Sequence, residues 1–560
     1  MWLAELIRGL PVRVVKEAGP VRVCDVTEDS RTVMPGSLFI ARRGREADGR
    51  AFVPAAIAAG AVAILSDDPA LTPGPEAQAR PGPALLVSED VELATALLAE
   101  RFYGEPSGKL VVIGVTGTNS KTTTSSLIHQ MLNALGVRTG LIGTVSIDDG
   151  VEIAPATLTT PTALETSLTL WRMVEAGCRA AVMEVSSHAL HQRRVAGLSF
   201  AVGVFTNLSG DHLDYHGTME AYAEAKSRLF AMLGPEAVAV VNADDGWHER
   251  LVAGTRARVL RCCLEELGAC RSCEPECRAR VVAGRARTTV AEFSGPWGSG
   301  RTELKLVGRH NVMNALQAGA ATWAAAQTVE RRKDAAFMLD GARMARLLAQ
   351  VEPPPGRLEM VSGPTDPVTV YVDYAHSDDA LGTVLRVLRG AALENPEAGA
   401  AVWCVFGCGG DRDRSKRPRM GAVAARQADH VILTSDNPRR EDPGAIVGEI
   451  MAGIPEPATP RVLVELDRER AIRLAIRRAA PGDIVLIAGK GHETYQILPD
   501  GRGGTVRRDF DDRRVAREAL RLRAQGTPPV SFRRAEGAAA SASSGRTEPA
   551  TPELPWMPRP

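Results

Sequence analysis

The chain has 560 residues, enough for three or four domains of ordinary size. Its 67 Lys and Arg residues balance 67 Asp and Glu residues, so bulk charge does not favour nucleic acid or an anionic membrane as a partner. The opening stretch MWLAELIRGLPVRVV is too interrupted by Arg and Pro for a signal peptide, and no apolar run approaches the roughly 18 residues of a membrane helix. We therefore expect a soluble, cytoplasmic protein.

Short apolar runs at 21–26, 37–41 and 61–66, separated by turns, predict a small α/β domain over residues 1–105. From residue 109 onward the runs LVVIGV, AAVMEV, FAVGVF and AVAVVN are each followed by a polar loop and a helical pattern. This rhythm predicts a mostly parallel sheet with crossover helices, and therefore an α/β fold.

The Pro-rich stretch VEPPPGR at 351–357 predicts a linker. A second series of buried strands follows it: VTVYVDY, AVWCVFG, HVILTSD and DIVLIAG. We therefore predict domains at 1–105, 106–350 and 351–525. Residues 526–560 are rich in Ala, Ser, Pro and Arg without periodicity, and we expect them to be disordered.

The segment VIGVTGTNSKTTT at 112–124 has the form of a phosphate-binding loop before a helix, which we predict from Lys121 to a C-cap at Gly136. Lys121 would neutralise phosphate charge and Thr122 would ligate Mg²⁺; the alternative is a capped turn with a solvated lysine. The general template asks for glycine where the chain has Val115 and Ser120. Serine keeps the backbone N–H that phosphate needs, and a positive φ there would cost about 1–2 kcal/mol relative to glycine.

Further polar residues follow other apolar runs, at the strand ends where open α/β sheets bind ligands. Glu184 and His212 are candidates to hold a divalent metal near the phosphates, although a lone histidine is more often structural. Lys226 lies in a helical pattern, and its spacing alone favours a solvated lysine.

Five of the nine cysteines crowd into one stretch: Cys262, Cys263, Cys270, Cys273 and Cys277. Their C-x-x-C-x-x-x-C spacing could hold zinc through thiolates. We favour the alternative, an Arg- and Glu-rich surface insertion with incidental thiols. The cysteine content does not suggest a secreted disulfide scaffold.

A series of motifs in one order resembles the Mur ligases: GVTGTNSKTTTS, TLTTPT, MEVSSHALHQRRV, FTNLSGDHLDYHGTMEAYAEAK, VDYAHSDDAL, FGCGGDRDRSKRP, SDNPR and AGKGHETYQ. The resemblance starts with DSRTVMPGSLF at 29–39 and extends to about residue 520. The family's nucleotide loop usually reads TGTNGKT, so Val115 fits and Ser120 departs, which bears on phosphate affinity. The resemblance implies an N-terminal UDP-binding domain, a central P-loop-type ATPase domain and a C-terminal Rossmann-like domain for an incoming amino acid.

The resemblance also implies roles for single residues. Positions around ATP are matched by Gly117, Thr118, Asn119, Ser120, Lys121, Thr122, Thr123, Asn311, Asn314, Arg357 and Asp373. Positions around a UDP-muramoyl dipeptide are matched by Ser30 and Arg31 at the uridine end and by Thr159, Thr160, Ser186, Gln192 and Arg194 at the dipeptide. The amino-acid pocket is matched by Arg412, Asp436, Asn437, Pro438, Arg439, Gly489 and Glu493.

Lys226 matches a lysine that CO₂ carbamylates, which would make it a carboxylate-like Mg²⁺ ligand beside Thr122, Glu184 and His212. His376 would lie near the reacting phosphate, which completes a catalytic set with Lys121. The DNPR form at 436–439 is the family's mark of members that add meso-diaminopimelate to the D-Glu γ-carboxylate with ATP, in peptidoglycan synthesis. The resemblance thus implies a monomeric cell-wall enzyme, serving cell shape and division, whose partners are small molecules.

Three alternatives compete with this interpretation. A lysine-adding relative would depart from DNPR, because lysine lacks the distal carboxylate that Arg412 and Arg439 would bind. Folylpolyglutamate synthase, another relative, is disfavoured by TTP, by the 1–105 domain and by DNPR. A nucleotide-binding module without ligase activity would have no use for Lys226 or for the two arginines.

Overall fold

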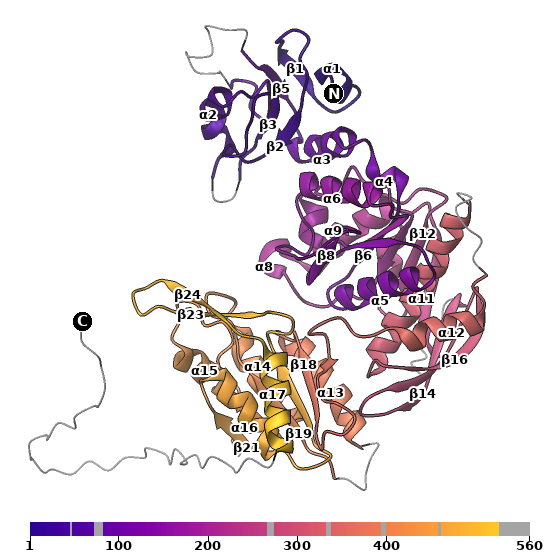
Figure 1. Ribbon diagram of the computed structural model, residues 1–560, viewed down its shortest axis with the longest axis vertical. Helices are drawn as coiled ribbons and strands as arrows, with labels where there is room; N and C mark the ends of the chain where they lie inside the picture. The colour runs from indigo at the N-terminus through magenta and orange to yellow at the C-terminus, as the bar shows by residue number, and fades with distance from the viewer. Residues whose placement is uncertain are drawn as a thin grey trace, which may run out of the picture.

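The chain folds into three α/β units, each built around its own sheet and arranged along the long axis of the molecule (Figure 1). The computed structural model describes residues 1–44, 47–71, 82–265, 274–331, 338–393, 399–456 and 461–525. The predicted three-domain α/β class is confirmed. No helix within these ranges is long and apolar enough to cross a bilayer.

The N-terminal unit has a five-stranded sheet in which only β1 runs antiparallel to its neighbour. In spatial order the strands are β1 (Arg13–Lys16), β5 (Ala84–Val87), β4 (Ala63–Ser66), β3 (Ser37–Ala41) and β2 (Asp25–Thr27). The helices are α1 (Leu3–Leu6), α2 (Val53–Ala58) and α3 (Val91–Phe102), with a short 3₁₀ helix η1 (Gly49–Phe52).

The central unit has an eleven-stranded sheet that is parallel in its middle and antiparallel at both edges. In spatial order the strands are β16 (Gly298–Leu304), β15 (Thr289–Gly295), β14 (Cys277–Gly284), β13 (Arg258–Leu264), β12 (Val238–Asn242), β11 (Val202–Phe205), β6 (Val111–Thr116), β10 (Ala180–Glu184), β7 (Thr139–Ile142), β8 (Ser146–Asp148) and β9 (Ile153–Pro155). The runs LVVIGV, AAVMEV, FAVGVF and AVAVVN form the buried strands β6, β10, β11 and β12, as predicted.

Helices cover both faces of the central sheet, which explains why its parallel strands are apolar throughout. One face packs against α5 (Lys121–Ala134), α11 (Arg309–Arg331) and α12 (Gly341–Gln350). The other packs against α6 (Ala163–Glu175), α7 (Ser187–His191), α9 (Met219–Ala231) and α10 (His248–Val252). Two short helices, α4 (Pro106–Lys109) and α8 (Leu213–His216), complete the unit. Helix α5 begins at Lys121 as predicted, and Gly136 follows its end with a φ of +82°.

The surface insertion predicted for the cysteine-rich stretch is wrong for the cysteines that the structure describes. Cys262 and Cys263 lie in β13 and Cys277 in β14, and all three are buried. Cys262 and Cys277 are register partners, and burial raises the pKa of the Cys262 thiol. The polar residues beside these cysteines alternate with buried residues along the strands, so they do not mark a loop. Cys270 and Cys273 lie outside the described residues, as does the predicted tail.

The C-terminal unit has a six-stranded sheet, parallel except for its short edge strand β17. In spatial order the strands are β17 (Glu359–Met360), β18 (Thr369–Asp373), β22 (Ile484–Ala488), β19 (Val402–Phe406), β20 (His430–Leu433) and β21 (Arg461–Val464). One face packs against α13 (Asp378–Leu393), α14 (Lys416–Gln427) and α15 (Pro443–Met451), the other against α16 (Arg468–Arg478) and α17 (Asp512–Ala524). A separate hairpin pairs β23 (Tyr495–Pro499) with β24 (Thr505–Asp509).

Two junctions hold the units together. Buried Glu100 on α3 accepts hydrogen bonds from the Ser107 N–H at 2.7 Å and from the Ser167 hydroxyl of α6 at 3.1 Å, which ties the N-terminal unit to the central one. At the other junction, the backbone of Glu352 exchanges two hydrogen bonds of 2.9 Å with the Gln130 side chain on α5. The VEPPPGR linker therefore runs against the helix that follows the phosphate-type loop.

Candidate active site

The loop between β6 and α5 is fixed by the segment that follows β11. Gly117 has a φ of +153°, and a Cβ there would lie 1.9 Å from the Thr206 hydroxyl, so the position requires glycine. The Thr118 N–H donates to the Asn207 carbonyl at 2.8 Å, and the Asn119 N–H donates to the Asn207 side chain at 2.9 Å. The loop is thus held open at the start of the helix, where N–H groups favour an anion.

Ser120 has a left-handed backbone conformation, which is the conformation that costs free energy for serine relative to glycine. Its φ is +70°, and its side chain makes no capping hydrogen bond to α5. Glycine would adopt this conformation without the penalty of about 1–2 kcal/mol that an L-residue meets. Ser120 is therefore tolerated by the loop rather than used by it.

Two lysines converge on one carbonyl of this loop. Lys121 donates to the carbonyls of Gly117 and Thr118 at 2.9 and 2.8 Å, and Lys226 donates to the Gly117 carbonyl at 2.8 Å. Lys226 is only 1% exposed and stands 4.4 Å above the Tyr222 ring, so the solvated lysine suggested by its spacing is excluded. Burial, and then the positive charge of Lys121, lower the pKa of Lys226 well below its usual value. Burial also lowers the pKa of Lys121.

Glu184 is fully buried beside the same loop, at the end of β10. One carboxylate oxygen accepts from the hydroxyls of Thr122 and Thr144 at 3.1 and 3.0 Å, and the other accepts from the Thr144 N–H at 2.7 Å. All these donors are neutral. A buried carboxylate held this way, next to the first turn of α5, presents oxygen to a hard cation.

His212 is the N-cap residue of α8, in the segment that follows β11. It has a φ of +54°, is half-exposed, and packs edge-on against His188 with ring centroids 4.9 Å apart. Within the described ranges no hydrogen bond joins it to Glu184, and no three His, Cys, Asp or Glu side chains group together as a metal cage would require. The predicted metal set is therefore not assembled from these two side chains alone.

The C-terminal unit reaches the loop through its first residues. Arg357 donates to the Thr122 hydroxyl at 3.3 Å and lies over the Tyr374 ring at 4.4 Å. Gly356 has a φ of +66°, and a Cβ there would lie 2.1 Å from the backbone nitrogen of His492, so the linker turns tightly against the C-terminal unit. The C-terminal unit thus contacts the first turn of α5 at Thr122.

The remaining residues predicted to lie near ATP or the reacting phosphate form local hydrogen bonds or are buried. Asp373 is buried and accepts from the N–H groups of Leu358 and Ala375 at 2.6 and 2.7 Å, and burial raises its pKa. His376 is exposed and bonds through Nδ1 to the Tyr374 carbonyl. Asn311 and Asn314 are buried on α11 and bonded to each other at 3.0 Å, while Thr123 is buried in α5.

A cavity of about 920 Å³ lies between the N-terminal and central units. It brings together five predicted dipeptide residues and the candidate metal ligand: Thr159, Thr160, Ser186, Gln192, Arg194 and His212. The sequence analysis missed other lining residues, including Arg42, Arg43, His188, His191, Tyr215 and Arg228. These residues lie in the stretches HALHQRR and DYH and in the adjacent pair Arg42 and Arg43, which are all visible in the sequence. Nothing in the sequence shows, however, that these separate stretches line one cavity.

Ser30 and Arg31 do not line this cavity. Arg31 is highly exposed and forms a bidentate pair with Asp29, with a shortest distance of 2.7 Å. Arg42, which does line the cavity, pairs with Glu28 at 2.8 Å. The predicted uridine residues therefore lie on the same segment as Glu28 but outside the cavity wall.

The predicted amino-acid residues meet at the carboxyl ends of β20 and β22. Gly489 has a φ of +114°, and a Cβ there would lie 2.4 Å from a carboxylate oxygen of Asp436, so only glycine lets these strand ends touch. Asn437 donates to Glu493 at 2.8 Å. Lys490, which lies in the AGKGHETYQ motif, is fully buried and donates to Asn437 and Glu493 at 3.2 and 3.0 Å.

Arg412 and Arg439 stand on two loops that pack directly together. Arg439 has a φ of +54° and donates to the Gly410 carbonyl at 2.7 Å, and a Cβ on Gly410 would lie 1.9 Å from the Pro438 carbonyl. Behind them the buried Arg417 donates to the Gly409 carbonyl at 3.1 Å and to both oxygens of Glu441. Arg412 itself is exposed. Both arginines border Gly409, where an added Cβ would lie 3.0 Å from Nη1 of Arg439 and 3.8 Å from Cγ of Arg412. A guanidinium can bind a carboxylate through two parallel N–H donors.

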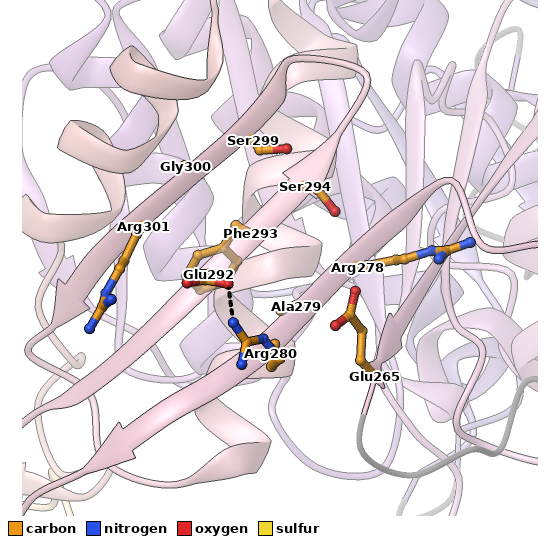
Figure 2. A pocket seen from close by; sticks show the side chains of 10 residues that line it. All are labelled: Glu265, Arg278, Ala279, Arg280, Glu292, Phe293, Ser294, Ser299, Gly300 and Arg301. Atoms are coloured by element: carbon orange, nitrogen blue, oxygen red, sulfur yellow. Dashed lines mark hydrogen bonds and ion pairs between the residues drawn. The ribbon is translucent and has the colours of Figure 1, made fainter.

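A second cavity, of about 390 Å³, lies on the outer face of β14, β15 and β16, away from all these residues (Figure 2). Arg280, Glu292 and Arg301 face outward in register across the three strands, and Arg280 and Glu292 form an ion pair of 2.6 Å. Such a ladder of alternating charge is typical of a solvated sheet face. It supports no separate active site.

Sequence profiles of one family match most of the chain. The Mur ligase family catalytic domain matches residues 23–103, the Mur ligase middle domain 115–322, and the Mur ligase glutamate ligase domain 356–491.

Individual relatives match over nearly their whole length. The UDP-N-acetylmuramoyl-L-alanyl-D-glutamate–2,6-diaminopimelate ligase of Synechococcus elongatus is 44% identical over 534 residues, covering 93% of this chain and 99% of that one. The ligase of the same name from Geobacillus kaustophilus is 44% identical over 533 residues, covering 93% and 100%. A solved structure of a ligase with this name matches with a TM-score of 0.63 and 32% identity, over 94% of this chain and 99% of that one.

Proposed function

This chain belongs to the Mur ligase family, whose members are ATP-dependent ligases, and we propose that it joins meso-2,6-diaminopimelate to the D-Glu γ-carboxylate of UDP-N-acetylmuramoyl-L-Ala-D-Glu. The observation that carries the proposal is one continuous arrangement of two sites. The loop whose carbonyls accept from Lys121 and Lys226 meets the C-terminal unit where Arg357 donates to Thr122, and that unit bears Arg412 and the DNPR stretch at 436–439.

The proposed division of labour follows the predicted domains. Residues 1–105 would hold the uridine end, with Ser30 and Arg31, and residues 106–350 would hold ATP and the dipeptide. Residues 351–525 would bind the incoming amino acid. The cavity of about 920 Å³ between the first two units supports this division, because it joins the predicted dipeptide residues to two arginines of the N-terminal unit. We propose that the enzyme acts as a cytoplasmic monomer in peptidoglycan precursor synthesis.

The residues at the loop fit Mg²⁺ and a carbamate on Lys226. Glu184 offers a buried carboxylate with only neutral donors, and the Thr122 hydroxyl lies 3.1 Å from it. The lowered pKa of Lys226 favours the neutral amine that CO₂ needs for carbamylation. Mg²⁺, held by Thr122, Glu184, His212 and carbamylated Lys226, would supply positive charge at the phosphoryl oxygens when bound.

The proposed chemistry has two steps. The D-Glu γ-carboxylate attacks the γ-phosphorus of ATP, the bond to the β–γ bridging oxygen breaks, and ADP leaves with an acyl phosphate formed. The free amine of diaminopimelate then attacks the acyl carbon, phosphate leaves, and the amine loses its proton. In this proposal Lys121 and the N–H groups at the start of α5 stabilise charge on the transferring phosphoryl group, and His376 would lie nearby. Closure between the units would exclude water from the acyl phosphate.

Charge selects the amino acid. The distal end of diaminopimelate carries an ammonium and a carboxylate, for which Asp436 and Glu493 provide acceptors and Arg412 and Arg439 provide planar donors. Lysine would leave the arginines without a carboxylate partner, and discrimination built on such unpaired groups is large.

Phosphate release from ATP, measured with each substrate omitted in turn, tests the proposal. Release should require both the UDP-muramoyl dipeptide and diaminopimelate, and the product mass should equal the tripeptide. Release of the same rate with ATP alone would favour a nucleotide-binding module that hydrolyses ATP without ligation.

A further inference from the structure

Arg468 lies at an unusual position for a cation. It is the first residue of α16, where the helix dipole disfavours positive charge, and its side chain is fully buried. Its partner, Asp512, is the first residue of α17 and is also fully buried. The two helices lie side by side on one face of the C-terminal sheet (Figure 1).

The guanidinium uses its donors in two directions. Nε and Nη2 donate to the two carboxylate oxygens of Asp512, each at 2.7 Å. Nη2 also donates to the Ala488 carbonyl at 2.9 Å, and Nη1 donates to the Ser435 carbonyl at 3.3 Å. These carbonyls belong to the residues immediately before Gly489 and Asp436.

The strands that lead to these two carbonyls are not adjacent, because β19 lies between β20 and β22 and pairs with both. The Arg468 side chain therefore bonds the ends of two strands that do not pair with each other, in addition to the Lys490–Asn437 hydrogen bond. Burial lowers the pKa of Arg468 and the charge of Asp512 raises it, with a net upward shift to which Asp436 and Glu493 also contribute. Arg468 is thus within electrostatic range of both acids of the pocket.

Stability alone does not account for this pair. A buried ion pair can often be replaced by apolar side chains of similar volume without loss of stability. An apolar pair, however, could not donate to the Ser435 and Ala488 carbonyls, and buried carbonyls require donors. Compared with an apolar side chain, the arginine therefore adds hydrogen bonds that fix the positions of the two strand ends.

We propose that Arg468 is a positioning residue for the amino-acid pocket, fixing the strand ends that carry Asp436 and Gly489 at the separation the incoming amino acid requires. The inference rests on the proposed ligase function. Arg468 touches neither nucleotide residues nor the central unit in its hydrogen bonds, so its influence should be confined to the amino-acid substrate.

The test is the double variant Arg468→Met/Asp512→Leu in the full chain, which removes both charges together. Its KM for diaminopimelate should rise about tenfold to a hundredfold, since a misplacement of about 1 Å costs up to about a hundredfold, while its KM for ATP stays within about twofold. The matched control is Arg473→Met/Glu518→Leu. That pair also joins α16 to α17, at 2.9 Å, but contacts no strand end, so both KM values should stay unchanged.

The outcomes separate the two claims. A wild-type protein without ligase activity contradicts the proposed function. An active wild type whose folded Arg468→Met/Asp512→Leu variant keeps its diaminopimelate KM overturns the positioning role alone. If the double variant does not fold, the variant Arg468→Lys tests the positioning role, because lysine keeps the positive charge but lacks the planar, forked donors of the guanidinium. A selective rise in diaminopimelate KM of about fivefold supports the role, and an unchanged KM overturns it.

Discussion

The phosphate loop and the amino-acid pocket treat charge in opposite ways. At the loop, Lys121 and Lys226 donate to backbone carbonyls, and Glu184 accepts only from hydroxyl and N–H groups. Within the described residues none of these three forms an ion pair. In the C-terminal unit, Lys490 pairs with Glu493 at 3.0 Å, and Arg417 with Glu441 at 2.8 Å.

Under the proposed function, the difference follows from what each site would do. Charges that are already paired fix a geometry, as a pocket that discriminates between similar amino acids requires. Charges without opposite partners stay available for phosphate and cation, at the cost of burying them. The loop is therefore the part whose groups depend most on bound substrate, and the pocket is the part assembled by the protein alone.

The largest expected effect is at Lys226. Lys226→Ala should reduce kcat by about a thousandfold, the upper range for removing a group that stabilises transition-state charge. A short carboxylate with Mg²⁺ should partly restore phosphate release if the lysine acts as a carbamate. Lys305→Ala, which removes an exposed lysine paired with Glu352, is the control and should keep full activity. Full activity in Lys226→Ala would contradict a catalytic role for a carbamylated Lys226. It would also weaken the contrast between the unpaired charges at the loop and the paired charges in the amino-acid pocket.

Removing a paired charge that supports the amino-acid pocket should change the free energy of unfolding more than the rate of the reaction. Glu441→Gln leaves buried Arg417 with one acid fewer and should lower the free energy of unfolding by about 2 kcal/mol at pH 7. Its partner Arg417 lowers the pKa of Glu441 to about 2.

The pH dependence of Glu441 has a defined sign. A carboxylate whose folded pKa is depressed contributes stability above its unfolded value, near 4.5, and loses it as pH falls toward 2. Denaturant titrations should therefore show wild type and Glu441→Gln converging between pH 5 and pH 2. The control Glu303→Gln alters an exposed pair and should change stability by less than about 0.5 kcal/mol. A constant difference at all pH values would contradict the paired-charge account.

Arg439→Lys tests recognition within the pocket. The variant keeps the charge but loses the planar fork, so the KM for diaminopimelate should rise about tenfold with the KM for ATP unchanged. Steady-state kinetics with each substrate varied gives both values. The neighbouring Arg440, exposed and paired with Asp411, provides the control Arg440→Lys, which should behave as wild type. An equal rise in both KM values would indicate a structural role for Arg439.

Ser120→Gly should have the smallest effect. Relief of the left-handed strain gains about 1–2 kcal/mol, and the greater chain entropy of glycine offsets about 0.5–1 kcal/mol of it. Stability should therefore rise by about 0–1.5 kcal/mol, and the ATP KM should stay within about twofold. A large fall in ATP KM would show that serine weakens phosphate binding.

Strands buried on both faces could be predicted from the sequence, because parallel strands covered by helices read as continuous apolar runs. The strands β14, β15 and β16 were missed, since each exposes one face and their alternating Arg and Glu residues look like a loop. The same pattern led to the wrong assignment of Cys262 and Cys277, whose burial depends on register between two strands.

Residues of the site were predictable where a motif or strand end marked them, and hidden where a distant partner makes them functional. Lys121 at the start of the helix follows from the loop pattern, whereas the positive φ of Ser120 was only a condition that the structure turns out to meet. Arg468 and Arg417 read as solvated helical arginines, and only packing against Asp512 and Glu441 reveals that they are buried. The spacing of residues along the sequence cannot show that Arg468 has a partner 44 residues away.

Amino-acid choice tests the central claim most directly. The wild-type protein, given ATP, Mg²⁺ and UDP-N-acetylmuramoyl-L-Ala-D-Glu, should be assayed for phosphate release and product mass with meso-diaminopimelate, lysine and other amino acids. The account predicts kcat/KM for diaminopimelate at least about a thousandfold above that for lysine, because lysine leaves Arg412 and Arg439 unmatched. Equal turnover with lysine would contradict it.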